Sequence, residues 1–168
     1  AVRLFESAAR QGDARGMTWL ALCLLRGHGT TLDTPRAASL FEQAAQRGAH
    51  LAQYWRGRVL YFGIGIERDF SGAAYWLQLA AAQGQPEAQD LLARCHFFGR
   101  GVEENRAAAA RCWRQAAGQG VVSASFCLGM CLYAGEGLPA DAAEAATHFR
   151  AAARKGLTGA MFLLGQCH

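Results

Sequence analysis

The feature that most constrains this chain is a short motif that returns at a fixed interval. The motif is Ala-Ala-x-x-Gly, and each copy ends 36 residues after the previous one. Its final glycines are Gly12, Gly48, Gly84, Gly120 and Gly156. A constant period of about 20–50 residues is the signature of repeat architectures, in which each structural unit packs mainly against its neighbours. The period therefore predicts a repeat fold before any single residue is interpreted.

Two further markers keep the same period. Gly-x-Gly begins fifteen residues after each of the first four motif glycines, and an Asp or Asn follows six residues after the first glycine of each pair. The pairs start at Gly27, Gly63, Gly99 and Gly135, and the polar residues are Asp33, Asp69, Asn105 and Asp141. Because three markers agree on one register without an insertion, chance does not explain the period.

Each repeat contains two segments with the pattern of a helix. Residues 89–98 carry apolar side chains at spacings of three to four, which is typical of an amphipathic helix, and we name this segment helix A. The second segment, for example Thr34–Gln46, follows an Asp or Asn that can accept hydrogen bonds from the first free backbone N–H groups, and we name it helix B. Asp141 and Glu144 also have the spacing of a capping box. The marker glycines are expected to end the helices, because glycine adopts the left-handed conformation without steric cost.

These segments predict an all-α fold, a right-handed α-α superhelical solenoid of 36-residue helix-loop-helix repeats. We expect a single solenoid domain over residues 1–168. It is made of a half repeat (1–12), repeats 13–48, 49–84, 85–120 and 121–156, and a second half repeat (157–168). The Ala pairs let helices approach closely, and a large residue seven positions before each motif glycine is expected to fill the space between repeats. These large residues are Phe5, Phe41, Leu77, Trp113 and Phe149.

Composition and charge exclude several classes of protein. A hydrophobic content of 52% with 18% charged residues is ample for a core, so the chain is not disordered. The net charge of +4 is scattered, with no run of five basic residues, which argues against a nucleic acid partner and hints only weakly at acidic partners. Glycines interrupt the longest uncharged stretch, residues 115–135, so we expect no membrane insertion.

The two ends of the sequence predict contacts beyond it. Ala1–Phe5 already has the pattern of a helix, with no initiator Met and no signal peptide, so we expect the chain to be a piece of a longer protein. Met161–Leu164 is apolar where a terminal repeat needs a polar cap. We therefore expect more repeats, or another subunit, to cover one or both ends.

The six cysteines are predicted to be structural thiols. Four of them share one position of helix A: Cys23, Cys95, Cys131 and Cys167. Equivalent atoms of adjacent repeats lie about 10 Å apart, which is too far for a disulfide. Cys95-His96 recurs as Cys167-His168, but no CxxC or HxxxH spacing accompanies it, and His96 lies at a position that holds Leu in other repeats. We predict no metal, no cofactor and no catalytic residue, and the free thiols favour a reducing, cytoplasmic compartment.

The last full repeat carries the resemblance to a known family. Leu128-Gly129, Gly135-x-Gly137, Asp141 and Ala152-Ala153-x-x-Gly156 together resemble the Sel1-like repeat family, a branch of the tetratricopeptide-like superfamily. The resemblance covers the whole chain and implies an adaptor that holds partner proteins or peptides on a curved surface. Three repeats depart from the Leu-Gly pair, with Leu20-Ala21, Arg56-Gly57 and Leu92-Ala93. The two alanines are expected to pack, whereas the pattern does not explain Arg56.

In this superfamily helix A lines the concave face, so the resemblance places candidate partner contacts among the larger residues of helix A. These candidates are Tyr54, Arg58, Tyr61, Phe62, Asp90, Arg94, Phe97, Phe98, Phe126 and Tyr133. The same register adds Arg15, Thr18, Leu22, Leu25 and Met130 to this face. Tyr61, Phe97 and Tyr133 form one stripe and Arg58 and Arg94 another, and both residue types dominate binding hot spots. The alternative is that the three aromatic residues only pack between helices.

We therefore expect a protein–protein interaction scaffold or adaptor that binds a peptide or protein segment in the helix A groove. The alternative is a self-assembling solenoid that forms a homo-oligomer through its uncapped end helices. An RNA-reading role is disfavoured because a basic track is missing. No nucleophile–base set can be assigned from spacing, so we expect that the chain is not an enzyme.

Overall fold

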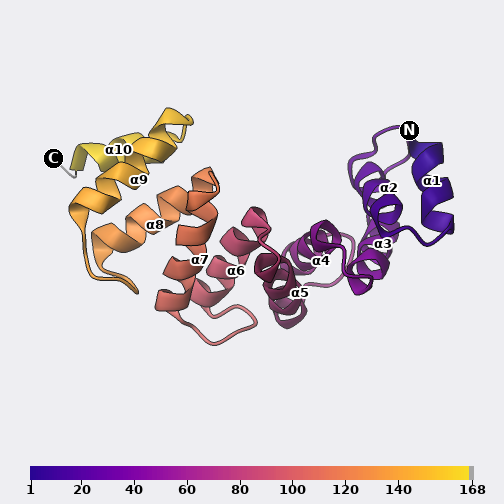
Figure 1. Cartoon of the computed structure of the whole chain (residues 1–168), viewed down its shortest axis with the longest axis horizontal. Coiled ribbons are helices and arrows are strands. Elements are labelled where there is room, and N and C mark those ends of the chain that lie inside the picture. Colours follow the sequence, from indigo (N-terminus) through magenta and orange to yellow (C-terminus); the bar gives the residue numbers. More distant parts are fainter. Residues whose placement is uncertain (167–168) are drawn as a thin grey trace. The chain divides into compact units, whose positions relative to one another are not determined.

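The computed structural model describes residues 1–166, and within this range the chain forms ten α-helices and no strand (Figure 1). The helices are α1 (Val2–Arg10), α2 (Ala14–Arg26), α3 (Thr34–Gln46), α4 (His50–Phe62), α5 (Phe70–Ala82), α6 (Pro86–Phe98), α7 (Arg106–Gly118), α8 (Val122–Ala134), α9 (Ala142–Arg154) and α10 (Thr158–Gln166). Even-numbered helices are helix A of the repeat and odd-numbered helices are helix B. The predicted all-α helix-loop-helix fold is confirmed. Across these residues, no helix combines the length and the apolar character needed to cross a membrane.

The chain divides into two compact units, unit 1 (Ala1–Ala88) and unit 2 (from Gln89 onward). In unit 1 the helices α1 to α5 pack against one another in chain order, from the pair α1 and α2 to the pair α4 and α5. In unit 2, α8 lies between α7 and α9, and α10 packs on α9 (Figure 1). The Phe97 ring of α6 lies 5.3 Å from the Trp113 ring of α7, which joins these two helices. One continuous domain stays a prediction.

The helix ends follow the sequence markers. α2, α4 and α8 end at the first glycine of each Gly-x-Gly pair, which has a left-handed conformation with φ between 65° and 73°. The B helices of the four repeats begin after an Asp or Asn whose side chain accepts a hydrogen bond from a backbone N–H of the first turn. Local chemistry thus sets both ends of the loop that joins helix A to helix B.

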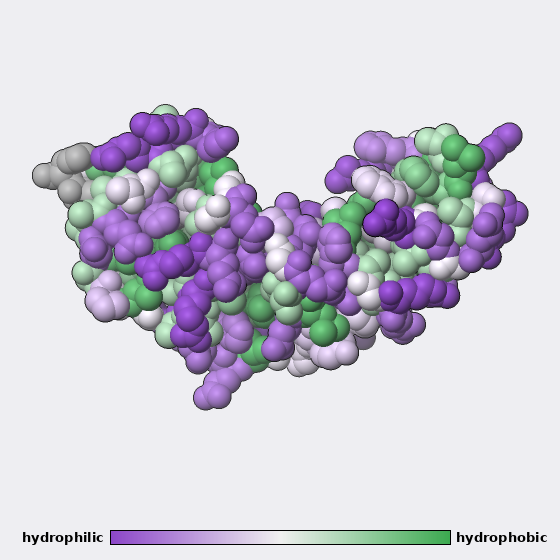
Figure 2. All heavy atoms as spheres, in the orientation of Figure 1, coloured by the Kyte–Doolittle hydropathy of each residue, from purple (hydrophilic) through white to green (hydrophobic). Residues whose placement is uncertain are grey.

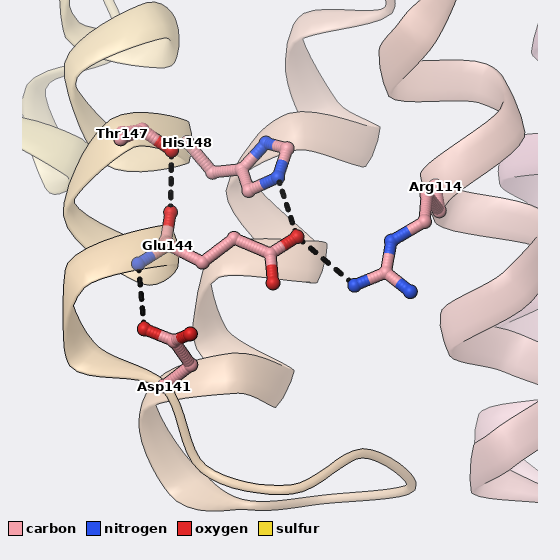
Figure 3. Close-up of polar contacts among 5 residues, drawn as sticks. All are labelled: Arg114, Asp141, Glu144, Thr147 and His148. Atoms are coloured by element: carbon pink, nitrogen blue, oxygen red, sulfur yellow. Dashed lines mark hydrogen bonds and ion pairs between the residues drawn. The ribbon is translucent and has the colours of Figure 1, made fainter.

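Only half of the predicted capping box forms at the start of α9 (Figure 3). The Glu144 backbone N–H donates to Asp141 Oδ1 over 2.8 Å, as expected. The Glu144 carboxylate instead accepts a hydrogen bond from Arg114 of α7 over 3.0 Å and lies 3.7 Å from His148 Nε2. Because the carboxylate contacts a cation of the preceding B helix, this side chain links two repeats rather than closing its own cap.

A close contact between the two helices of a repeat holds each repeat together. The large residues predicted for this role on α3, α5, α7 and α9 are at most 3% exposed: Phe41, Leu77, Trp113 and Phe149. A Cβ atom on Gly129 would lie 2.7 Å from the Phe149 ring, and one on Gly57 would lie 2.7 Å from the Leu77 side chain. Ala21 and Ala93 take the small position elsewhere and are fully buried, so both pack as expected.

Arg56, which the repeat pattern does not explain, has a specific partner. Its guanidinium lies 3.2 Å from the carboxylate of Glu42 on α3, and the Arg56 side chain is 13% exposed. The position of Glu42 holds Glu6 in the first half repeat and Gln78, Arg114 and Arg150 in the later repeats, whereas the position of Arg56 holds Leu in every other repeat. Arg56 is therefore the one cation at its position, and it faces an acidic partner.

The second glycine of three loops, Gly29, Gly65 and Gly137, approaches the preceding helix B. Gly137 has a φ of 74°, and a Cβ atom there would overlap the carbonyl group of Arg106, the first residue of α7. Gly65 is placed in the same way against Thr34, because a Cβ atom on Gly65 would lie 2.6 Å from the Thr34 carbonyl carbon. Any side chain at these positions would push the loop away from the neighbouring repeat.

We expect Gly137→Ala to destabilise the chain more than Gly120→Ala. Gly120 also has a positive φ, of 88°, but nothing lies within 4 Å of its Cβ position. Both substitutions should carry the left-handed penalty of about 1–2 kcal/mol, and Gly137→Ala should add the cost of separating the loop from α7. Urea unfolding followed by circular dichroism measures the difference, and equal losses would mean that the loop contact contributes nothing.

Candidate protein-binding site

The predicted contact residues of unit 1 have unequal exposure. Phe62 is 50% exposed, whereas Tyr61 is 5% exposed. The guanidinium carbon of Arg58 lies 4.7 Å from the centre of the Trp55 ring, and Tyr54 is half-buried with its ring edge-on to Trp55. Tyr61 therefore has almost no surface to offer a partner, and packing accounts for it.

The aromatic stripe at Tyr61, Phe97 and Tyr133 does not share one environment. Tyr61 packs against Phe70, the first residue of α5, with 5.3 Å between ring centres. At the equivalent position of the next repeat, the guanidinium of Arg106 lies 5.0 Å from the Phe97 ring. In the last full repeat (121–156) this position holds Ala142, which has no long side chain, and Tyr133 is 43% exposed. The identity of the first residue of helix B therefore indicates whether the aromatic side chain of the stripe is covered or exposed. Comparing this residue between repeats could have predicted the exposure of Tyr133.

Asp90, which was predicted as a partner contact, has internal partners in unit 2. It accepts hydrogen bonds from Trp113 Nε1 over 2.9 Å and from Ser123 Oγ over 2.8 Å. Arg94, one turn further along α6, lies 3.3 Å from the same carboxylate. The Asp90 side chain is 13% exposed. Because its oxygens are committed to α6, α7 and α8, Asp90 holds these helices together.

A small apolar cavity opens beside this anchor, and we name it the α6–α8 pocket. Its volume is about 240 Å³. It is lined by Arg94, Phe97, Phe98, Trp113, Cys127, Met130, Cys131, Ala134 and Glu136. Trp113 and Cys131 are buried, whereas Phe98 is 56% and Met130 41% exposed. The pocket therefore has a buried apolar floor and an open apolar rim.

Charges border the pocket but are largely paired. Arg94 pairs with Asp90, and Glu136 pairs with Arg106 over 2.8 Å. The guanidinium of Arg100 lies 5.1 Å from the Phe98 ring. A ligand that enters the pocket consequently meets mostly carbon and sulfur surface, and Arg94 is the cation among the lining residues.

The pocket gathers three predicted residues and several that sequence reasoning missed. Arg94, Phe97 and Phe98 were expected on this face, as was Met130 by register. The missed lining residues come from α7, α8 and the following loop: Trp113, Cys127, Cys131, Ala134 and Glu136. Phe126 does not line this pocket but a wider cavity of about 680 Å³, which shares Arg94 and Cys127 with it. The Phe126 ring centre lies 5.9 Å from that of Phe149.

The thiols of the described residues form no disulfide. Burial raises the pKa of Cys95 and of Cys127 to about 11, and that of Cys131 to about 12. Burial also lowers the pKa of His96, whose Nδ1 is enclosed without a hydrogen-bond partner, so the ring is neutral at neutral pH. Residues 1–166 contain no group of three or more His, Cys, Asp or Glu side chains suited to a metal ion. Cys167 and His168 lie outside the described residues.

Comparison with family models decides what kind of repeat this is. The Sel1 repeat model matches residues 1–13, 14–48, 50–85, 86–121 and 123–157. The chain belongs to the Sel1 repeat family. The matched segments agree within two residues with the repeat boundaries expected from the glycine register. No curated protein matches the chain.

Several solved structures are similar to this chain. A protective antigen of uropathogenic Escherichia coli with an SLR fold is 28% identical, with a TM-score of 0.91 over 98% of this chain and 35% of its own. A Sel1 repeat protein of Oxalobacter formigenes is 32% identical, with a TM-score of 0.86 over 99% of this chain and 49% of its own. An immunity protein of Pseudomonas aeruginosa, 20% identical with a TM-score of 0.62 over 95% of this chain and 59% of its own, shares the fold. The chain thus spans between a third and about half of the first two proteins.

We expect Asp90→Ala to destabilise unit 2, because the buried Trp113 N–H loses its acceptor. An unsatisfied buried donor costs about 1–3 kcal/mol. In a Trp113→Phe background the same substitution should cost less, since no indole N–H remains, and Phe already occupies this position at Phe41 and Phe149. A double-mutant cycle by urea denaturation measures the coupling. Identical losses in both backgrounds would show that the hydrogen bond does not anchor the helices.

Proposed function

We propose that this Sel1 repeat chain is a scaffold that binds a segment of a partner protein over α6 and α8. The Sel1 repeat fold is generally a protein–protein interaction scaffold. The observation that carries the proposal is the α6–α8 pocket, where Phe98 and Met130 remain 56% and 41% exposed beside a buried apolar floor. Exposed aromatic and Met side chains around a concave apolar site are typical of protein-binding surfaces.

The surroundings of the pocket also suit a peptide chain. Tyr133 of α8 is 43% exposed, and Arg94 is 37% exposed at the edge of the cavity. Together they offer a phenol and a planar cation that can form hydrogen bonds with a backbone or a carboxylate. The buried Asp90 network holds Arg94 and Trp113 in place, so little side-chain freedom is lost when a partner binds. The proposal therefore keeps Arg94, Phe97, Phe98 and Tyr133 as contacts and omits Asp90 and Tyr61.

We expect Phe98→Glu to weaken peptide binding by at least about tenfold, because the loss falls on an exposed anchor of the site. Random linear peptides displayed on phage are selected against the purified chain, and the enriched peptides are titrated by fluorescence anisotropy. Tyr75→Glu is the matched control, since Tyr75 is 58% exposed but lies on α5, a B helix of unit 1. If no peptide is enriched, or if both variants bind equally well, the site is not the one proposed.

Self-assembly is the second candidate, and exposed apolar residues on α1 and α10 favour it. Leu4 is 73% exposed, and Met161 and Phe162 are 58% and 70% exposed. In Figure 2 hydrophobic and hydrophilic residues are interspersed over the visible face, and hydrophobic residues lie near α1 among hydrophilic ones. A second copy of the chain that buries such residues would form a homo-oligomer.

If these residues form contacts between two copies of the chain, we expect the average molecular mass in solution to rise with protein concentration. Phe162→Glu should abolish this rise. Multi-angle light scattering measures the mass, with Tyr75→Glu as the control for added charge. A monomeric mass at every concentration would contradict self-assembly. That the chain is not an enzyme and that it does not bind nucleic acid both remain predictions.

A further inference from the structure

The residues of the α6–α8 pocket have counterparts in unit 1, at residue numbers 72 lower, which is two repeats. The counterpart of Cys127 is Trp55, and the counterpart of Ala134 is Phe62. Both positions hold an aromatic side chain in unit 1 and a small side chain in unit 2. The cavity in unit 2 therefore lies where unit 1 places two of its own rings.

In unit 1 the indole at this position is well packed. Trp55 is 8% exposed and stacks on Phe41 of α3, with 5.7 Å between ring centres and 11° between ring planes. The guanidinium carbons of Arg58 and Arg26 lie 4.7 Å and 5.9 Å from the centre of the Trp55 ring. The indole thus lies against an aromatic ring of helix B and is covered by two cations of helix A.

Unit 2 keeps an aromatic ring of helix B at this site but has different side chains in place of the two arginines. Trp113 takes the place of Phe41 and is 3% exposed on the floor of the pocket. Phe98 and Met130 take the places of Arg26 and Arg58. Aromatic edges and a Met sulfur make favourable contacts with an aromatic ring. Unit 2 therefore presents the floor and the cover of an indole site without supplying the indole.

We propose that the α6–α8 pocket receives an aromatic side chain, best matched by Trp, from the protein segment bound by this face. The inference rests on the proposed function and names the chemistry that the site recognises. The volume of about 240 Å³ lies below the range of about 300–1,000 Å³ typical of pockets for drug-sized ligands, so it suits a single side chain. Trp is also among the residues that most often anchor protein interfaces.

The probe for the test is N-acetyl-tryptophanamide, a neutral molecule that carries one indole. The chain contains three methionines, so the protein labelled with ¹³C at the Met methyl groups gives three signals. Met130 lines the pocket, Met17 is buried in unit 1, and Met161 is exposed on α10. We expect the probe to shift the Met130 signal through the ring current of its indole and to leave the other two unchanged.

Two variants that fill the pocket should abolish this shift. Cys127→Trp places an indole where unit 1 has Trp55, and Ala134→Phe places a ring where unit 1 has Phe62. Ala134 is exposed, so the second variant tests the site even if the first does not fold. Leu163→Trp is the control, because it adds an indole at the same repeat position in α10, outside the pocket, and should leave the Met130 response intact.

The outcomes separate this inference from the proposed function. A Met130 shift that is lost in both filled variants supports the aromatic site, and it does so even if no displayed peptide binds the chain. An equal or larger shift with N-acetyl-leucinamide, or a full response in Ala134→Phe, overturns it. Peptides that bind the wild type and Cys127→Trp with the same affinity also overturn it, while leaving the scaffold function in place.

Discussion

Phe149 of α9 lies so close to α8 that a Cβ atom on Gly129 would come within 2.7 Å of its ring. The same large-against-small contact recurs between Leu77 and Gly57, and fully buried Ala21 and Ala93 take the small position in the other repeats. Because this contact sets the distance between the two helices of a repeat, every other side chain has a defined place.

This regular frame makes single substitutions informative. The position of Trp55 holds Cys127 in unit 2, where residues of α6, α7, α8 and the following loop line a cavity of about 240 Å³. In a repeat fold, such a cavity is not compensated by distant movements, because each repeat contacts only its neighbours. Under the proposed function, differences between repeats rather than the shared pattern carry the recognition chemistry.

Polar side chains specialise individual repeats in the same way. Asp90 accepts two hydrogen bonds and pairs with Arg94 in unit 2, whereas Arg56 pairs with Glu42 in unit 1. Each cluster links neighbouring helices through a charged residue, Asp90 or Arg56, that no other repeat carries at its position. Sequence reasoning placed Asp90 and Arg94 on one helix face, but it had no means to detect the indole N–H and the hydroxyl that donate to the Asp90 carboxylate.

The sequence by itself determined the all-α repeat, its helices, the marker glycines and the buried positions, because backbone conformation and hydrophobic periodicity are local properties. It also placed Arg94, Phe97 and Phe98 on one helix face. Only the tertiary structure decided which of these side chains are exposed, since that depends on what the next helix brings: Phe70 covers Tyr61, whereas Ala142 leaves Tyr133 open. The pocket itself is a property of three helices together, so no single segment of the sequence contains it.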